Sequence, residues 1–136
     1  LHCLTSDRSG IGHLEQVEAL CAAGARWIQF RMKGTHLNEW ISVAREVVEV
    51  CRRHAVTSIV NDSIEVAIAA GADGVHLTEA SVQASEVKNN FPDLIIGVST
   101  HSLEGARLAE TQGADFITFS PIYETPSKTS YGSPQL

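Results

Sequence analysis

An amide and two cationic side chains alternate along a short stretch of the sequence. Gln29, Arg31 and Lys33 are each separated by one residue. This period-two spacing places all three on one face of an extended segment. A solvated edge strand could show the same pattern, but Gln29 lies inside an apolar run, where an unpaired polar group costs free energy. We therefore predict that this face of the segment binds a ligand.

Asn61 and Asp62 end a second apolar run, and Ser63 and a helical pattern follow them. One interpretation is a plain helix N-cap, because all three residue types accept hydrogen bonds from free helix amides. If Ser63 is the cap, Asn61 and Asp62 remain available to a ligand. Asp62 could then bind Mg²⁺, a hard cation that takes oxygen ligands. The sequence leaves both interpretations open.

Three later apolar runs also end in polar residues. His76 could be a catalytic base, but we favour a packed, hydrogen-bonded core residue at this position. Ser99 and Thr100 offer hydroxyl groups to an anion. The last run leads into residues 120–132, where two prolines and Lys128 predict a lid or a binding loop.

The cationic residues Arg31, Lys33 and Lys128 come from two segments that are far apart in the sequence. If the fold brings them together, they suit a ligand with two or three phosphate groups better than a neutral one. The sequence contains neither an HExxH motif nor a Ser-His-Asp order typical of hydrolases, and its histidines lack metal-binding spacing.

A repeat in the sequence indicates which elements position these residues. Each copy has Gly-Ala, a polar residue and a short, mostly apolar run, and each follows a helical pattern: 24–30, 71–77 and 113–119. The glycine is expected to end a helix at positive φ, before a turn into a buried strand. Further strands are predicted at 2–5, 57–61 and 94–99, and further helices at 38–54 and 84–90.

Strict alternation of strands and helices predicts an α/β fold with a parallel sheet, because parallel neighbours need crossover connections. The repeat recurs every two strand–helix units, which favours a TIM-type (βα)8 barrel over an open, doubly wound sheet. About six strands do not complete such a barrel. We therefore expect 1–136 to be a single, partial barrel domain that lacks its C-terminal βα units.

Composition narrows the class of protein. The chain has 136 residues, a net charge of −6 and 43% hydrophobic residues, which fits a globular domain. The acidic balance argues against non-specific nucleic-acid binding, and no apolar run is long enough for a membrane span. Cys3, Cys21 and Cys51 have no metal-binding spacing and are expected to be buried thiols in the cytoplasm. The sequence leaves a homo-oligomer open.

Five motifs in this order resemble the thiamine-phosphate synthase and TenI family, and the resemblance covers essentially the whole chain. The motifs are Trp27-Ile28-Gln29-Phe30-Arg31-Met32-Lys33, Val60-Asn61-Asp62, Gly71-Ala72-Asp73-Gly74-Val75-His76-Leu77, Ile96-Gly97-Val98-Ser99-Thr100-His101-Ser102 and Pro121-Ile122-Tyr123-Glu124-Thr125-Pro126-Ser127-Lys128. Each motif is weak alone, and the five together are specific.

The resemblance implies a transferase that joins hydroxymethylpyrimidine diphosphate to thiazole phosphate, with Mg²⁺, to give thiamine phosphate and pyrophosphate. The residues that it implies for the diphosphate are Arg31, Lys33, Asn61 and Lys128. It places Asp62 on Mg²⁺ and Thr125 near the thiazole phosphate. Gln29 and Ser99 are expected to face the pyrimidine.

One position departs from the synthase pattern. Ser81 stands where synthases usually carry a second metal-binding Asp, and a hydroxyl is a poorer Mg²⁺ ligand than a carboxylate. This loss resembles the TenI branch, whose known activity is metal-free tautomerisation of a thiazole carboxylate phosphate. However, the chain keeps Lys33 and Asp62, and it has Pro121 where that tautomerase places a working His.

Three functions therefore follow from the resemblance. The chain is expected to belong to a synthase, and the alternatives are a TenI-like thiazole isomerase and a non-catalytic binder of thiamine phosphate. The synthase is favoured because Lys33 and the Asn61-Asp62 pair are kept and because Pro121 stands where the tautomerase has its working His.

Overall fold

The computed structural model describes residues 1–8 and 10–123. The chain forms two compact units, Leu1–His76 and Leu77–Leu136. The elements that begin in the first unit are β1 (Cys3–Leu4), α1 (His13–Ala22), β2 (Trp27–Phe30), α2 (Leu37–Arg53), β3 (Thr57–Asn61), α3 (Ile64–Ala70) and β4 (Gly74–Leu77). Those of the second are α4 (Ala84–Asn90), β5 (Ile95–Thr100), α5 (Leu103–Thr111) and β6 (Phe116–Phe119).

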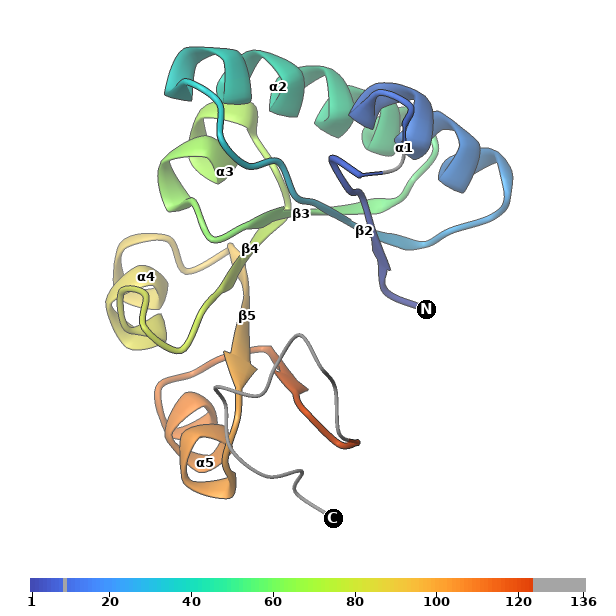
Figure 1. Ribbon diagram of the computed structural model, residues 1–136. Coiled ribbons are helices and arrows are strands. Elements are labelled where there is room, and N and C mark those ends of the chain that lie inside the picture. Colours follow the sequence, from blue (N-terminus) through green and yellow to red (C-terminus); the bar gives the residue numbers. More distant parts are fainter. Residues whose placement is uncertain (9, 124–136) are drawn as a thin grey trace. The chain divides into compact units, whose positions relative to one another are not determined.

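The first unit is a parallel sheet in which each strand pairs with the next one along the chain. Trp27 lies opposite Thr57 in the β2–β3 pair, and Asn61 lies opposite His76 in the β3–β4 pair. The helices α1, α2 and α3 lie on the same face of these strands (Figure 1). A doubly wound sheet carries helices on both faces, so this arrangement is that of a barrel-type fold.

Helix α2 shows why the helices dock on the sheet. Its buried residues recur at helical spacing: Ala44, Val47, Val48, Val50 and Cys51. They make one apolar stripe that packs on the strands, whereas charged residues occupy the other faces. The predicted helix at 38–54 is therefore confirmed, with bounds that differ by one residue at each end.

Glycine ends the helices that precede the three repeats, as predicted. Gly24, Gly71 and Gly113 have φ values of 86°, 68° and 82°. A residue with a Cβ is disfavoured in this left-handed region, so the glycines allow a short turn into the next strand. The other predicted strands and helices are confirmed to within one or two residues.

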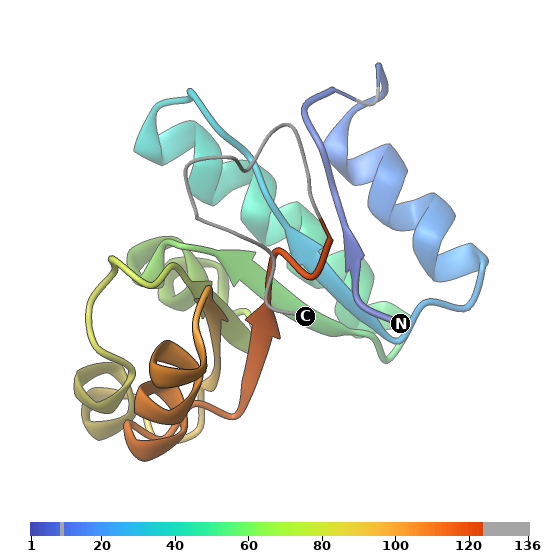
Figure 2. The same cartoon turned by 60° about the horizontal axis from the view of Figure 1, so that its bottom comes forward.

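The second unit contains the parallel pair β5 and β6, with Gly97 opposite Phe116. Helix α5 packs against both strands, and Figure 2 shows it alongside them. A Cβ on Gly97 would lie 2.1 Å from the Phe116 ring. Glycine is therefore required here by the close approach of an aromatic side chain from the neighbouring strand.

The aspartates of the second and third repeats join neighbouring strands at their amino ends. The Asp73 carboxylate accepts hydrogen bonds from the backbone N–H and the hydroxyl of Ser58, at 2.8 and 2.7 Å. Asp115 accepts from the backbone N–H of Ile96 at 2.8 Å. The repeated polar position thus satisfies backbone donors where a parallel ladder begins.

Two of the three cysteines are buried as expected. Cys21 and Cys51 are 7% and 1% exposed, and burial raises the pKa of both thiols, to about 12 for Cys51. The expectation for Cys3 was wrong, because it is only half-buried on β1. Among the described residues, no helix is both long and apolar enough to cross a membrane.

We expect Asp73→Ala to lower the free energy of unfolding of the full-length protein by about 1–3 kcal/mol, because the buried Ser58 amide loses its acceptor. Urea unfolding measures the change. Glu46→Ala, on the exposed face of α2, is the control and is expected to change stability by less than about 0.5 kcal/mol. Equal stability of the wild type and Asp73→Ala would show that the Asp73–Ser58 interaction contributes nothing.

Candidate functional site

The candidate residues of the first unit lie where β2 and β3 end. Strand β2 stops at Phe30, so Arg31 and Lys33 belong to the irregular segment that follows rather than to the strand. Gln29 is 2% exposed, Arg31 is half-buried and Lys33 is exposed. The strand therefore ends before the period-two pattern does, and burial falls from Gln29 to Lys33.

Gln29 is held by residues of the two following strands. Its Nε2 donates to Asn61 Oδ1 at 2.8 Å, and its Oε1 lies 2.8 Å from His76 Nδ1. With the amide in this orientation, Nδ1 of His76 carries the proton and donates. Because Asn61 accepts from Gln29 through its oxygen, its NH₂ group is the end that would donate to a ligand oxygen. This polar chain explains how an amide is tolerated inside an apolar layer.

His76 is a core residue, as we favoured over a catalytic base. It is 6% exposed, and burial lowers its pKa to about 4, with a further contribution from His2. His2 packs against it with ring centroids 5.9 Å apart. A neutral His76 has one N–H and one lone pair, which matches its role as the donor that begins the Gln29–Asn61 chain.

The N-cap interpretation is confirmed for Ser63, whereas Mg²⁺ binding by Asp62 stays a prediction. Ser63 Oγ accepts from the backbone N–H of Val66, so Ser63 is the N-cap of α3. Asp62 is exposed and has a φ of 63°, a left-handed conformation that is uncommon outside glycine. Its backbone N–H donates to the His76 carbonyl at 2.9 Å.

Three residues that sequence analysis did not assign to the site lie beside Arg31 and Lys33. Thr5 is 1% exposed, and its hydroxyl accepts from the Arg31 backbone N–H at 3.0 Å. His13, the first residue of α1, lies 2.9 Å from Thr5 Oγ1 and 2.8 Å from Asp7 Oδ1. The one signal in the sequence was the position of Thr5 and Asp7 just after the first apolar run.

In the second unit, Ser81 makes local hydrogen bonds. Its Oγ accepts from the Thr78 backbone N–H at 3.0 Å and lies 2.6 Å from Thr78 Oγ1. Ser99 is half-buried and accepts from Thr118 at 3.3 Å. Thr100 is fully buried and its hydroxyl donates to a backbone carbonyl, so it does not offer that hydroxyl to an anion as we expected.

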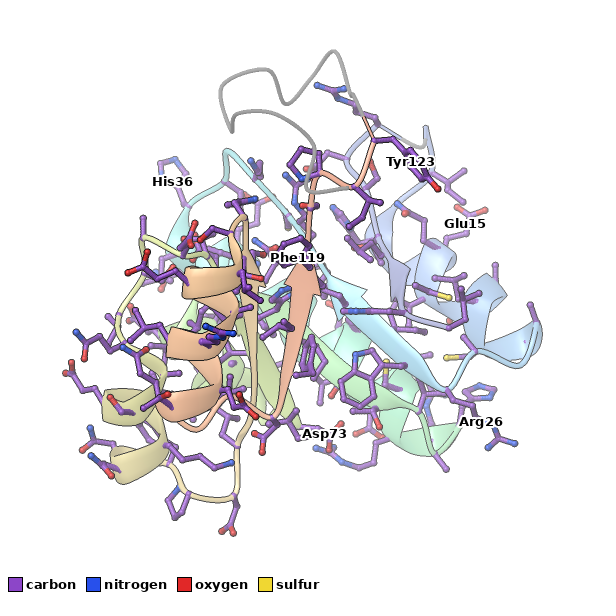
Figure 3. The ribbon with its side chains drawn as sticks, turned by 90° about the horizontal axis from the view of Figure 1, so that it is seen from below. Glu15, Arg26, His36, Asp73, Phe119 and Tyr123 are labelled. Carbon is purple, nitrogen blue, oxygen red and sulfur yellow. The ribbon has the colours of Figure 1, made fainter. Side chains whose placement is uncertain are left out.

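Different residues lie at the two opposite ends of the strands in the first unit. Figure 3 places His36, which follows the Arg31–Lys33 segment, at one end of this unit and Arg26 and Asp73 at the other. The carboxyl ends of parallel strands are the usual location of ligand sites in this fold class. The candidate residues of β2 and β3 lie at those ends.

Some predicted residues cannot be placed. Thr125 and Lys128 lie outside the described residues, so the expected meeting of Lys128 with Arg31 and Lys33 stays a prediction. Within residues 1–8 and 10–123, no group of three or more His, Cys, Asp or Glu side chains could hold a metal ion.

The low pKa of His76 predicts a loss of stability in acid. Between about pH 6.5 and pH 4 the unfolded chain binds a proton that the folded chain does not, so the free energy of unfolding falls as pH falls through this range. The loss is about 2–3 kcal/mol. Urea unfolding at about pH 7 and about pH 4.5 should show a smaller pH effect in His76→Asn, which keeps a donor near Gln29. An unchanged pH effect would contradict the assignment.

Comparison with known proteins shows which family this chain resembles in sequence. Residues 1–135 match the family model described as thiamine monophosphate synthase (TMP-TENI). The chain is 40% identical over 128 residues to a putative thiamine-phosphate synthase 2 of Aquifex aeolicus, which covers 93% of this chain and 69% of that protein. It is 41% identical over 135 residues to a putative thiamine-phosphate synthase of Geobacter sulfurreducens, covering 96% of this chain and 63% of that one.

A solved structure agrees. A thiamine phosphate pyrophosphorylase from Pyrococcus furiosus matches with a TM-score of 0.85 and 31% identity, over 91% of this chain and 61% of its own. This likeness confirms the parallel α/β barrel type of fold. The chain spans less than two thirds of both that structure and the Geobacter protein. From the family match over residues 1–135, the chain belongs to the thiamine monophosphate synthase family.

Proposed function

We propose that the full-length protein is a thiamine-phosphate synthase, a transferase that couples hydroxymethylpyrimidine diphosphate to thiazole phosphate and releases pyrophosphate. The observation that carries the proposal is the position of Arg31 and Lys33 just beyond β2, next to Asn61 and Asp62 at the end of the paired strand β3. Two cations and an amide donor suit a diphosphate. The family match through residues 1–135 supports the same substrates.

The proposed roles follow from charge. If the diphosphate leaves before the thiazole nitrogen attacks, negative charge grows on the leaving group, and fixed donors that already point at it lower the barrier. Arg31, half-buried, offers a planar pair of N–H donors, and Lys33 offers a point charge. Asn61 adds its NH₂ group, because its side-chain oxygen is engaged by Gln29. Lys128 is proposed to add a third cation.

Mg²⁺ is proposed as the cofactor, with Asp62 as its protein ligand. Mg²⁺ is commonly held by one or two carboxylates together with substrate phosphates and water, so one exposed carboxylate beside a diphosphate fits this habit. When bound, the ion would neutralise part of the leaving group's charge. Ser81 is not counted as a ligand, because its hydroxyl is engaged with Thr78.

Gln29, Ser99 and Thr125 are proposed to contact the organic parts of the substrates. Ser99 is half-buried at the end of β5 and is proposed to contact the pyrimidine side, and Thr125 is proposed near the thiazole phosphate. Gln29 is nearly enclosed, and its amide is bonded to Asn61 and His76. Its contribution is therefore proposed to include the orientation of Asn61.

The engagement of Ser81 is the observation that favours an alternative. A synthase without its second acidic position resembles a TenI-like thiazole isomerase, or a protein that binds thiamine phosphate without turnover. Incubation of the full-length protein with both synthase substrates and Mg²⁺ separates the three. Absence of thiamine phosphate would reject the synthase, and metal-free isomerisation or binding without turnover would identify which alternative holds.

Removal of either cation should impair use of the diphosphate substrate. We expect Arg31→Ala and Lys33→Ala each to lower kcat/KM by roughly 100-fold, because charge that develops on the leaving group loses a fixed partner. Steady-state kinetics of the full-length protein measure this. The control is Arg26→Ala at the opposite end of the same strand, which should stay within about two-fold. Equal effects of the three variants would reject the proposed site.

A carboxylate at position 81 should strengthen metal binding. Ser81→Asp can still accept from the Thr78 N–H while it adds a negative charge, so we expect half-maximal activity at a lower Mg²⁺ concentration. Ser81→Asn has a similar size without the charge and should leave the midpoint unchanged. Identical Mg²⁺ titrations for the wild type and Ser81→Asp would count against a metal-binding role of position 81.

A further inference from the structure

One histidine is connected, through its hydrogen-bond partners, to the segment that carries both cationic residues. His13 is nearly buried, with 10% of its side chain exposed, and both ring nitrogens have partners. Nδ1 lies 2.9 Å from Thr5 Oγ1, and Nε2 lies 2.8 Å from Asp7 Oδ1. Thr5 and Asp7 both follow the end of β1, so the imidazole contacts the beginning of the β1–α1 loop.

Thr5 and Asp7 each lie near the backbone N–H of one residue in the segment that follows β2. The Thr5 hydroxyl oxygen accepts from the backbone N–H of Arg31 at 3.0 Å. The backbone N–H of Lys33 lies near enough to the Asp7 carboxyl to contribute to its lowered pKa. A single imidazole is therefore linked through Thr5 to the Arg31 amide, and its other partner, Asp7, lies close to the Lys33 amide.

The hydrogen atoms have a consistent arrangement. Thr5 Oγ1 accepts from Arg31, so its own hydrogen is free to point to Nδ1 of His13, which then accepts. Nε2 carries the ring proton and donates to Asp7. This is one tautomer of a neutral imidazole with both nitrogens used. The bond from His13 lowers the pKa of the Asp7 carboxyl, which keeps it an acceptor.

Packing fixes the ring and the loop around it. The Phe30 ring, 2% exposed, meets His13 edge-on, with ring centroids 5.1 Å apart and an interplanar angle of 89°. Gln16, one turn along α1, accepts from the Ser6 backbone N–H and donates to the carbonyls of Ser6 and Ile11, at 2.9 to 3.0 Å. The β1–α1 loop is thereby a supported frame rather than a passive connection.

The segment that is held has no regular structure of its own. Residues 31–34 belong to no helix or strand, so main-chain ladder bonds do not set the direction of the Arg31 and Lys33 side chains. A shift of about 1 Å in a positioning group can cost on the order of 100-fold in rate. Supporting hydrogen bonds behind a binding residue commonly prevent such shifts.

We infer that His13 is a positioning residue for anion binding: with Thr5 and Asp7 it clamps the backbone amides of Arg31 and Lys33 so that both cations meet the diphosphate together. The inference rests on the proposed function of these two cations. It assigns a role to three residues of the β1–α1 region, of which Thr5 accepts from the backbone of the segment that carries the cations.

The test uses the full-length protein and two readouts. The first is hydrogen exchange of the Arg31 and Lys33 backbone amides by NMR, which reports the clamp without any ligand. The second is the affinity for inorganic pyrophosphate by calorimetry, together with KM for each synthase substrate. His13→Phe keeps a ring against Phe30 but removes both hydrogen bonds. His13→Gln restores a side chain that can both accept and donate, and His54→Phe, at the exposed end of α2, is the control.

We expect His13→Phe to lose protection at both amides and to weaken pyrophosphate binding by roughly 10-fold, with KM for thiazole phosphate unchanged within about two-fold. His13→Gln should recover part of both losses, and His54→Phe should resemble the wild type. Loss of protection with unchanged pyrophosphate affinity would overturn the inference, as would equal losses for both substrates or protection that persists in His13→Phe.

Two further variants keep the test decisive if His13→Phe does not fold. Thr5→Val breaks only the Arg31 branch, and Asp7→Ala breaks only the Lys33 branch, so each should expose one amide and weaken pyrophosphate binding. Unchanged affinity in both would reject the clamp. Failure of the proposed function gives a different result, because the wild type itself would then fail to bind pyrophosphate or to form thiamine phosphate.

Discussion

Parallel pairing is the constraint on which the candidate site depends. Neighbouring parallel strands point the same way, so each must be followed by a crossover helix, and their carboxyl ends meet at one edge. In the unit Leu1–His76 the β2–β3 register places Phe30 opposite Val60. The residues that follow these two positions are consequently neighbours, although about thirty residues separate them in the sequence. The cations and the Asn61-Asp62 pair lie near each other there because of the pairing rather than through local sequence.

Polar side chains lie inside an apolar layer at the same edge, and hydrogen bonds between them offset the cost of their burial. Gln29 lies between Ile28 and Phe30 in a strand whose last three residues are all buried. Its amide is paired on one side with Asn61 and on the other with His76. A buried chain of this kind is stable only when each member has a partner. Its outer end is an NH₂ group, which suits an anion and does not suit a cation.

Strand β2 ends before Arg31 and Lys33, so the placement of these two residues depends on side chains from the β1–α1 loop. Strand β2 stops at Phe30, and α2 begins at Leu37. Between them the backbone N–H of Arg31 donates to Thr5, and that of Lys33 lies near the Asp7 carboxyl. Two kinds of support therefore act at this edge: a core chain through Gln29 that orients Asn61, and a loop contact through His13 that holds the cationic segment.

The sequence by itself determined the order and type of the elements and the family. These depend on local signals: apolar spacing sets helices and strands, and Gly24, Gly71 and Gly113 end helices because a left-handed residue is needed at each. The sequence also offered Ser63 as one candidate for the helix cap, a contact that spans only three residues. Family resemblance pointed to Arg31, Lys33 and Asn61 because a motif preserves residue types in order.

Only the tertiary structure decided which polar groups meet. Gln29 bonds to residues 32 and 47 positions away, and Arg31 bonds to one 26 positions away. No spacing rule links such residues, because their proximity comes from strand register and helix packing. For this reason His13 carried no signal, Thr100 was wrongly expected to face an anion, and His76 was recognised as a core residue only as a preference. Local structure follows from residues that are neighbours in the sequence, whereas partners at such separations are brought together by the fold.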